Sequence, residues 1–190
     1  MRKIIFGLAL LLLLGACAAK PAAEVDIARE VRAFYLDSGV AMTMTIGADF
    51  GDRVSEFTVD YQGFADGSAV VTVLSPKEIA GITARVTATN TSLVYDDLIL
   101  ELGRLSGTAL TPMDAAPSVV RALREGHAAN TAKTKVGEKA CWQITYASEE
   151  NGKPVERQVW LDEKTLAVVR AEVFADGGRV LTLTNNFVQP

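Results

Sequence analysis

Apolar and polar residues alternate with a period of two over most of the chain. From Val40 to Ile46 apolar residues occupy every second position, and residues 56–62 repeat this alternation. A period of two is typical of a β-strand with one apolar face. The same pattern predicts about ten strands in all, the others at 69–74, 82–88, 92–95, 98–102, 142–146, 155–161, 167–174 and 180–187.

Turn-forming residues separate these segments and favour hairpins between neighbours. Asp66-Gly67 and Asp176-Gly177 are typical turn pairs, and Asn151-Gly152 is the sequence that a two-residue type I′ hairpin prefers. Pro76 ends the strand at 69–74 because proline cannot donate a hydrogen bond to a neighbouring strand. The sequence therefore predicts strands that pair in antiparallel order.

Two segments change to the spacing of three and four residues that a helix requires. Residues 24–35 carry one apolar face, which predicts a first helix. A second helix is expected after Asp114, which is a candidate N-cap, with Pro117 in the first turn and Gly126 at the end. Two helices and about ten strands predict an α+β fold with one large curved antiparallel sheet, which the helices cover only in part.

The N-terminal residues have the pattern of a bacterial lipoprotein signal. Arg2 and Lys3 precede an apolar run of 11 residues, 4–14, which is too short to cross a bilayer. Residues 14–17 read Leu-Gly-Ala-Cys, so we expect residues 1–16 to be removed and Cys17 to carry the lipid anchor, with acyl groups such as palmitate. An ordinary secretory signal with an accidental cysteine is the alternative. Residues 17–23 then form a lipidated tether, and residues 24–190 form the domain.

The net charge and the number of cysteines limit the classes of molecule that the chain could bind and the disulfides that it could form. Without the signal the chain has 17 basic and 23 acidic residues, a net charge of about −6, which disfavours nucleic acid and anionic lipid headgroups. Membrane attachment would then depend on Cys17 alone. Cys141 has no second cysteine to pair with, so we interpret it as a strand residue.

Catalytic motifs are missing from the sequence. His127 is the only histidine, and its place after Gly126 favours an exposed residue over a catalytic base. Asp96, Asp97 and Glu101 could be considered as metal ligands, but consecutive residues in a turn point apart. We therefore expect no enzyme activity, no metal and no cofactor.

Apolar side chains on one face of the sheet are the candidate functional site. The predicted lining of an apolar groove consists of Val40, Met42, Met44, Ile46, Phe57, Val59, Tyr61, Leu98, Leu100, Trp142 and Ile144 on strands, faced by Val119 and Leu123 on the second helix. Methionine side chains adapt to irregular ligands. The alternative is that the same residues form a dry core, because any half-buried sheet shows this alternation.

Several segments resemble the LolA/LolB-like family of lipoprotein-sorting proteins. They are Val-Trp-Leu-Asp-Glu-Lys-Thr at 159–165, Val-Arg-Ala-Glu at 169–172, Asp176-Gly177, Asn186-Phe187, Pro76 with Ile79, Gly81 and Ile82, and the stretch 102–123. The resemblance extends over residues 24–187. It implies an unclosed half-barrel with a helical lid, whose concave face holds acyl chains of lipoproteins or other lipids. No family binding residue matches closely enough to be carried over.

The resemblance and the lipobox together lead to two functional hypotheses. The first is a membrane-anchored, extracytoplasmic lipoprotein that binds acyl chains or another hydrophobic ligand in the groove. The second is a non-catalytic adaptor that uses the same fold to bind or regulate a cell-envelope protein. A shuttling carrier is disfavoured because the chain has its own anchor at Cys17. Ala18 follows the cysteine where an aspartate would favour retention at an inner membrane, so in a cell with two membranes we expect the outer one.

Overall fold

The computed structural model describes residues 22–87, 89–96, 98–103, 111–150 and 152–186. Within these residues eleven strands form one antiparallel sheet, so the predicted α+β fold with a large curved sheet is confirmed. The strands are β1 (Val40–Asp49), β2 (Val54–Gly63), β3 (Ala69–Ser75), β4 (Thr83–Val86), β5 (Thr91–Tyr95), β6 (Leu98–Gly103), β7 (Ala128–Val136), β8 (Lys139–Glu150), β9 (Lys153–Asp162), β10 (Val168–Ala175) and β11 (Gly178–Asn185).

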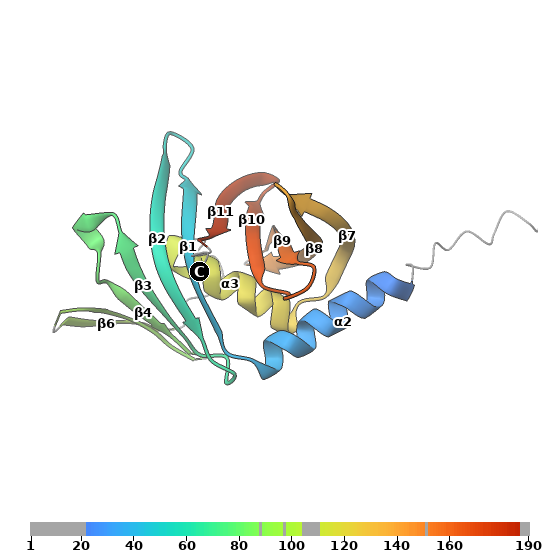
Figure 1. The fold of residues 1–190 in the computed structure, drawn as a ribbon. Helices are drawn as coiled ribbons and strands as arrows, with labels where there is room; N and C mark the ends of the chain where they lie inside the picture. The colour runs from blue at the N-terminus through green and yellow to red at the C-terminus, as the bar shows by residue number, and fades with distance from the viewer. Residues whose placement is uncertain (1–21, 88, 97, 104–110, 151, 187–190) are drawn as a thin grey trace, which may run out of the picture.

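The sheet bends around a helix without closing. Its strand order is β6-β5-β4-β3-β2-β1-β11-β10-β9-β8-β7, so the first and the last strand of the sequence pair with each other near the middle of the sheet. The strands β6 and β7 are the two edges and do not pair with each other. Figure 1 shows α3 lying in the hollow between the two halves of the sheet. The architecture is therefore a half-barrel with a helical lid.

The edge strand β7 was not predicted from the sequence. It reads Ala-Ala-Asn-Thr-Ala-Lys-Thr-Lys-Val, and Thr131 is its one buried residue among these nine. An edge strand exposes more of its surface than a central strand, and lysines on it discourage pairing with other chains. Because the inward positions of β7 are polar, the period of two is hidden in this segment.

The two helices are α2 (Ala22–Asp37) and α3 (Pro112–Glu125). The predicted first helix is confirmed, but the predicted N-cap of the second is wrong. Thr111 is the N-cap: its hydroxyl oxygen accepts a hydrogen bond from the Asp114 N–H at 3.3 Å and donates to the Asp114 carboxylate at 2.5 Å. Pro117 consequently lies beyond the first turn, and Gly126 ends the helix as predicted.

Two arginines fasten α2 and α3 to each other. Arg32 of α2 donates to the carbonyl oxygens of Arg124 and Glu125 at 3.0 and 2.6 Å. In return Arg124 of α3 donates to the carbonyl oxygens of Tyr35 and Ser38 at 2.7 and 3.3 Å. The last carbonyl groups of a helix have no partner within the helix, and cationic side chains satisfy them well. Each helix therefore caps the C-terminal end of the other.

The core lies between the inner face of the sheet and the two helices. Ile27, Val31 and Tyr35 of α2 are buried, and the Tyr35 hydroxyl donates to the Leu166 carbonyl oxygen at 2.9 Å. The helix α3 packs on β1, β2, β3, β9 and β11, whereas α2 packs on α3 and β7. Neither helix is long and apolar enough to cross a membrane, as judged over the described residues. The signal, Cys17 and residues 18–21 of the predicted tether lie outside these residues. Ala22 and Ala23, which the sequence placed in the tether, already belong to α2.

Candidate functional site

Most of the predicted groove residues lie together beneath α3. They are almost fully buried and belong to a single apolar cluster: Met42, Met44, Ile46, Val59, Tyr61, Val119, Leu123 and Ile144. Burying one such side chain stabilises the fold by about 2 kcal/mol. The helix α3 thus covers the centre of the inner face as a lid would, with its own side chains against those of the strands.

Three predicted groove residues form the margin of this cluster. Val40, Phe57 and Trp142 are partly buried and pack against it. The ammonium group of Lys133 lies 4.8 Å from the centre of the Trp142 ring, within the range of a cation–π contact. Trp142 is therefore held at the β7 side of the molecule, with its ring shielded on one face by a charged side chain.

Leu98 and Leu100 lie apart from the covered cluster, on the edge strand β6. Their exposed fractions are 74% and 58%, in contrast to 8% for Met42. Cross-strand pairing nevertheless places them on the same face of the sheet. One row of directly paired residues runs from β1 to β6 through Met42, Tyr61, Val71, Ala84, Leu93 and Leu100.

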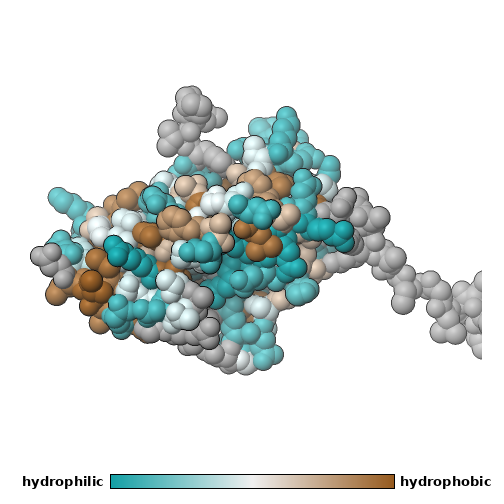
Figure 2. Space-filling view, turned by 90° about the horizontal axis from the view of Figure 1, so that it is seen from below, coloured by the Kyte–Doolittle hydropathy of each residue, from teal (hydrophilic) through white to brown (hydrophobic). Residues whose placement is uncertain are grey.

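This row passes from a covered to an open environment without ceasing to be apolar. Val71 and Ala84 are buried, Leu93 is half-buried and Leu100 is exposed. Leu102 adds a further exposed apolar side chain on β6, whereas the exposed side chain of Ile99 lies on the opposite face of the sheet. In Figure 2 hydrophobic residues gather at the left end of the molecule, where Figure 1 places β4 and β6. Contiguous exposed apolar surface of this kind marks sites that bind ligands, membranes or proteins.

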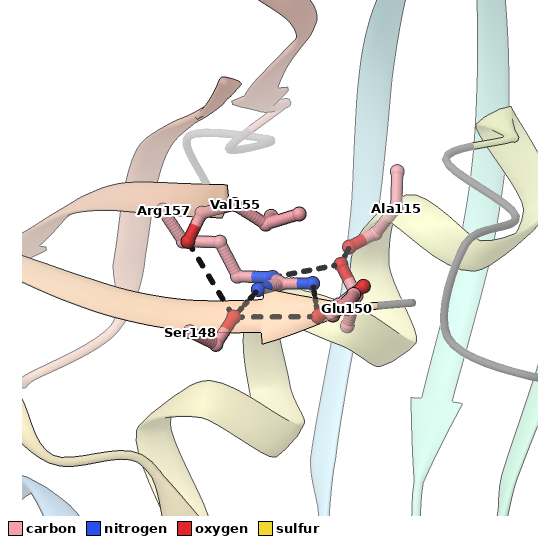
Figure 3. A network of polar contacts seen from close by, with 6 residues as sticks. Ala115, Ser148, Glu150, Val155 and Arg157 are labelled. Atoms are coloured by element: carbon pink, nitrogen blue, oxygen red, sulfur yellow. Dashed lines mark hydrogen bonds and ion pairs between the residues drawn. The ribbon is translucent and has the colours of Figure 1, made fainter. Parts of the chain in front are cut away.

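A polar network interrupts the inner face on the opposite side of α3. Arg157 on β9 is buried, and its guanidinium donates to the Glu150 carboxylate at 2.5 Å and to the Ser148 hydroxyl at 3.0 Å (Figure 3). A third N–H of Arg157 donates to the Ser118 hydroxyl of α3 at 3.5 Å, and that hydroxyl donates to the Ala115 carbonyl oxygen at 3.0 Å.

A cavity of about 190 Å³ lies beside this network, between α3 and the β8–β9 hairpin. Its lining consists of Ser118, Arg121, Ala122, Glu125, Gly126, Tyr146, Ala147, Ser148, Glu150 and Arg157. Sequence reasoning missed this site altogether. The sequence of β8 could have indicated this site. Tyr146, Ser148 and Glu150 continue the inward-facing alternation of Trp142 and Ile144, but they carry polar groups.

Buried tyrosines place hydroxyl groups inside the otherwise apolar interior. Burial raises the pKa of Tyr61 to about 12, although the positive charges of Arg124 and Arg121 oppose this shift. Burial also raises the pKa of Tyr35 and of Tyr146 above the ordinary tyrosine range. All three hydroxyls therefore stay protonated at neutral pH.

The remaining candidates from the sequence are at the surface. His127 is exposed after the end of α3. Asp96 lies in the β5–β6 turn with a φ of 49°, and Asp97 lies outside the described residues. Over the part of the chain that the structure describes, no three histidine, cysteine, aspartate or glutamate side chains come together as metal ligands. Cys141 is a buried strand residue of β8, as predicted, with a free thiol.

Comparison with known proteins finds similarity of structure but not of sequence. No protein-family model and no curated protein sequence matches the chain. Among solved structures, an uncharacterized conserved protein of Thermus thermophilus aligns with a TM-score of 0.54 and 8% identity, over 85% of this chain and 84% of its own. A domain of Vibrio parahaemolyticus, described provisionally as an outer membrane lipoprotein-sorting protein, aligns with a TM-score of 0.52 and 10% identity, over 87% and 91%.

A third solved structure aligns less closely. It is a LolA superfamily protein of Nitrosomonas europaea, with a TM-score of 0.49 and 8% identity over 84% of this chain and 91% of its own. At such low identity, similarity of structure establishes the fold alone. The expected resemblance is confirmed at that level: this chain folds as a LolA-like unclosed half-barrel with a helical lid.

Proposed function

We propose that this chain is an exported, lipid-anchored protein that binds acyl chains on the inner face of its half-barrel and performs no catalysis. The observation that supports the proposal best is the apolar row from Met42 to Leu100, which continues beyond the cover of α3. Exposed apolar surface is unfavourable in water by about 25 cal/mol per Å². An acyl chain placed along the row would remove that surface from water.

In this proposal the ligand enters at β6 and extends toward α3. A chain laid on Leu100 next meets Leu93, then the buried Ala84 and Val71. Further penetration reaches Met42 and Met44, whose unbranched side chains can rearrange around a guest while α3 moves outward. The open β4–β6 end is thus the entrance, and the residues beneath α3 are the deep part of the site.

Lipid that copurifies with the chain tests this proposal. The full chain is expressed in bacteria and purified in detergent, and non-covalently bound lipid is extracted and identified by mass spectrometry. We expect acyl lipids with the original chain and their loss with Leu100→Asp, which places a charge on the inner face. The matched control is Ile99→Asp, because Ile99 is equally exposed on β6 but points to the outer face. Equal lipid content in the two variants would contradict the proposal.

The anchor requires its own experiment, since it is independent of the ligand. Cys17 supplies the thiol to which diacylglycerol would be joined, so Cys17→Ser should move the chain from the membrane fraction to the soluble extracytoplasmic fraction. The matched control is Cys141→Ser, which removes the other cysteine and leaves the lipobox intact. Membrane association that survives Cys17→Ser would exclude the lipid anchor.

The close packing beneath α3 favours a second candidate, a non-catalytic adaptor for a cell-envelope protein. Met44, Val59 and Leu123 belong to one buried apolar cluster and have exposed fractions of 1% or less, as in a core without a guest. An adaptor would use the exposed apolar surface of β6 against a protein. The expected result is then a chain that purifies folded but without lipid, and a cross-link from β6 to a defined envelope protein that Ile99→Asp and Leu100→Asp both abolish.

A further inference from the structure

We infer that the cavity between α3 and the β8–β9 hairpin is a binding site for a small zwitterion, an anionic phosphate joined by a short spacer to an ammonium group. Phosphoethanolamine has this chemistry, either as a free molecule or as the headgroup of a lipid. The inference goes beyond the acyl-chain proposal and does not depend on it, because it rests on a different cavity with a polar lining.

The size and the lining of the cavity exclude an acyl chain as its occupant. Pockets that enclose drug-sized apolar ligands measure about 300–1,000 Å³, whereas this cavity measures about 190 Å³. Four charged residues line it, the arginines 121 and 157 and the glutamates 125 and 150. A compact polar group fits this combination of small volume and opposite charges.

The floor of the cavity holds a buried cation with hydrogen-bonding capacity to spare. Arg157 is only 5% exposed, and a charge that far from water requires partners. Its guanidinium has five N–H groups, of which three bond to Ser118, Ser148 and Glu150 among the described residues. Figure 3 shows how the side chains of Ser148 and Glu150 converge on Arg157. Among the described residues the other two N–H groups have no partner, and we assign them to a phosphate oxygen.

The mouth of the cavity carries a second pair of opposite charges, on the helix α3. Arg121 and Glu125 are four residues apart on α3 and so lie on one face of the helix. Within the described part of the chain neither side chain has a hydrogen bond or an ion pair, and both are exposed. The charge of Arg121 acts on Tyr61 and Asp114 only from a distance, so both side chains at the mouth can still bind a ligand.

The balance of charges selects a zwitterion over a simple ion. A lone phosphate would approach Arg121 and Arg157 but would also meet Glu125 and Glu150. A lone amine would be attracted by the two glutamates and repelled by the two arginines. A molecule with both charges can pair each of its groups with an opposite one, and charge-assisted hydrogen bonds of this kind are the strong ones.

An aromatic wall supports the ammonium end of the ligand. Tyr146 lines the cavity, and Gly126 lies so close to its ring that a Cβ atom at position 126 would come within 2.7 Å of a ring carbon. The absence of a side chain at Gly126 therefore lets the ring remain in the wall. An ammonium group over a tyrosine ring gains a cation–π interaction.

Isothermal titration calorimetry of the full chain in detergent tests this inference. The ligands are glycerophosphoethanolamine, inorganic phosphate, ethanolamine and dihexanoyl phosphatidylethanolamine. We expect glycerophosphoethanolamine to bind more tightly than phosphate or ethanolamine alone. The double variant Arg121→Ala/Glu125→Ala should weaken it about tenfold, because it removes one solvent-exposed charge contact at each end of the ligand. The control is Arg29→Ala/Glu30→Ala, which removes two exposed charges from α2 and should leave binding unchanged.

The inference is overturned if the folded chain does not bind glycerophosphoethanolamine, if phosphate alone binds equally well, or if the Arg121→Ala/Glu125→Ala variant binds as the original does. Tighter binding of the dihexanoyl lipid identifies a lipid headgroup as the source, and equal binding identifies a free zwitterion. Loss of copurified acyl chains in Leu100→Asp with unchanged binding of glycerophosphoethanolamine would show that the two sites are separate.

Discussion

The inner face of the sheet differs between its centre and its β6 edge. At the centre, Met42 and Val59 lie beneath α3 and are buried. At the edge, Leu98 and Leu100 continue the same face and are exposed. The strands have apolar side chains on the inner face in both regions, but α3 lies only over the centre. Among the described residues, the apolar inner face of this half-barrel is therefore larger than the area that α2 and α3 cover, and the uncovered part lies at β4–β6.

We expect the covered and the open region to differ most in how much a leucine side chain contributes to the free energy of unfolding. Leu123→Ala removes a buried side chain of α3 and should lower the free energy of unfolding by about 3 kcal/mol. Leu100→Ala removes the same atoms from an exposed position and should change it by no more than about 0.5 kcal/mol. Urea denaturation followed by circular dichroism measures both, and equal losses would show that β6 is covered in solution.

The hydrogen bonds that hold α3 to α2 should make the next largest contribution to stability. Arg124→Ala removes the donors to the Tyr35 and Ser38 carbonyl oxygens, and hydrogen bonds from a charged donor are the stronger kind. We expect a loss of about 2 kcal/mol in the free energy of unfolding. Arg121→Ala on the same helix is the control and should have little effect. If α3 is the lid that moves for a guest, Arg124→Ala should also speed the exchange of α3 amide protons.

High pH should destabilise the covered region through its tyrosines. The pKa of Tyr61 is about 12 in the folded chain, compared with 10.0 when the side chain is free. Between these values the unfolded chain releases the proton and the folded chain keeps it, so stability is fully present below pH 10 and falls as the pH rises. The slope for one such group approaches about 1.4 kcal/mol per pH unit. Tyr35 and Tyr146 act in the same direction.

Unfolding free energies at pH 9, 10 and 11 measure this loss. Tyr61→Phe is the informative variant because it keeps the aromatic ring and removes the hydroxyl group that loses its proton at high pH. Its stability should fall less steeply above pH 10 than that of the original chain. Identical slopes would indicate that Tyr61 is accessible to water, and the centre of the sheet would then be less closed than the burial of Tyr61 indicates.

The smallest effect has the opposite sign and lies at the other edge of the sheet. Thr131 on β7 is buried, and its hydroxyl has no hydrogen-bond partner among the described residues. Thr131→Val replaces that hydroxyl with a methyl group of similar size and should raise the free energy of unfolding by about 1 kcal/mol. A loss of stability instead would show that the hydroxyl is satisfied by water. Thr134→Val, at a less buried position of the same strand, controls for strand propensity.

The strands could be predicted wherever one face of the sheet is apolar. The segment from Val40 to Ile46 alternates because every second side chain enters the core, and β1 covers that segment. Alternation fails at β7 because its inward residue Thr131 is polar. The N-cap of α3 was misassigned because Thr111 and Asp114 are both good caps, and the choice between them depends on where the preceding chain enters the helix.

The site could be predicted only in part, because alternation records which side chains face inward and not what covers them. Met42 and Leu100 have the same pattern in the sequence, although one is 8% exposed and the other 58%. The cavity beside Arg157 was not predicted from the sequence for a different reason. It is assembled from α3 and a hairpin, so Ser118 and Arg157 come together only when the lid is placed on the sheet.

The reciprocal bonds of Arg32 and Arg124 have a mechanical consequence. The helix α2 leads from the N-terminal part of the chain, and its C-terminal end is joined to that of α3 by both arginines. In Figure 1 the start of α2 and the strand β6 lie at opposite ends of the molecule. A load applied at the start of α2 is therefore transmitted along its axis both to α3 and, through the backbone that follows Asp37, to β1, whereas the strands at the open end lie farther along the sheet.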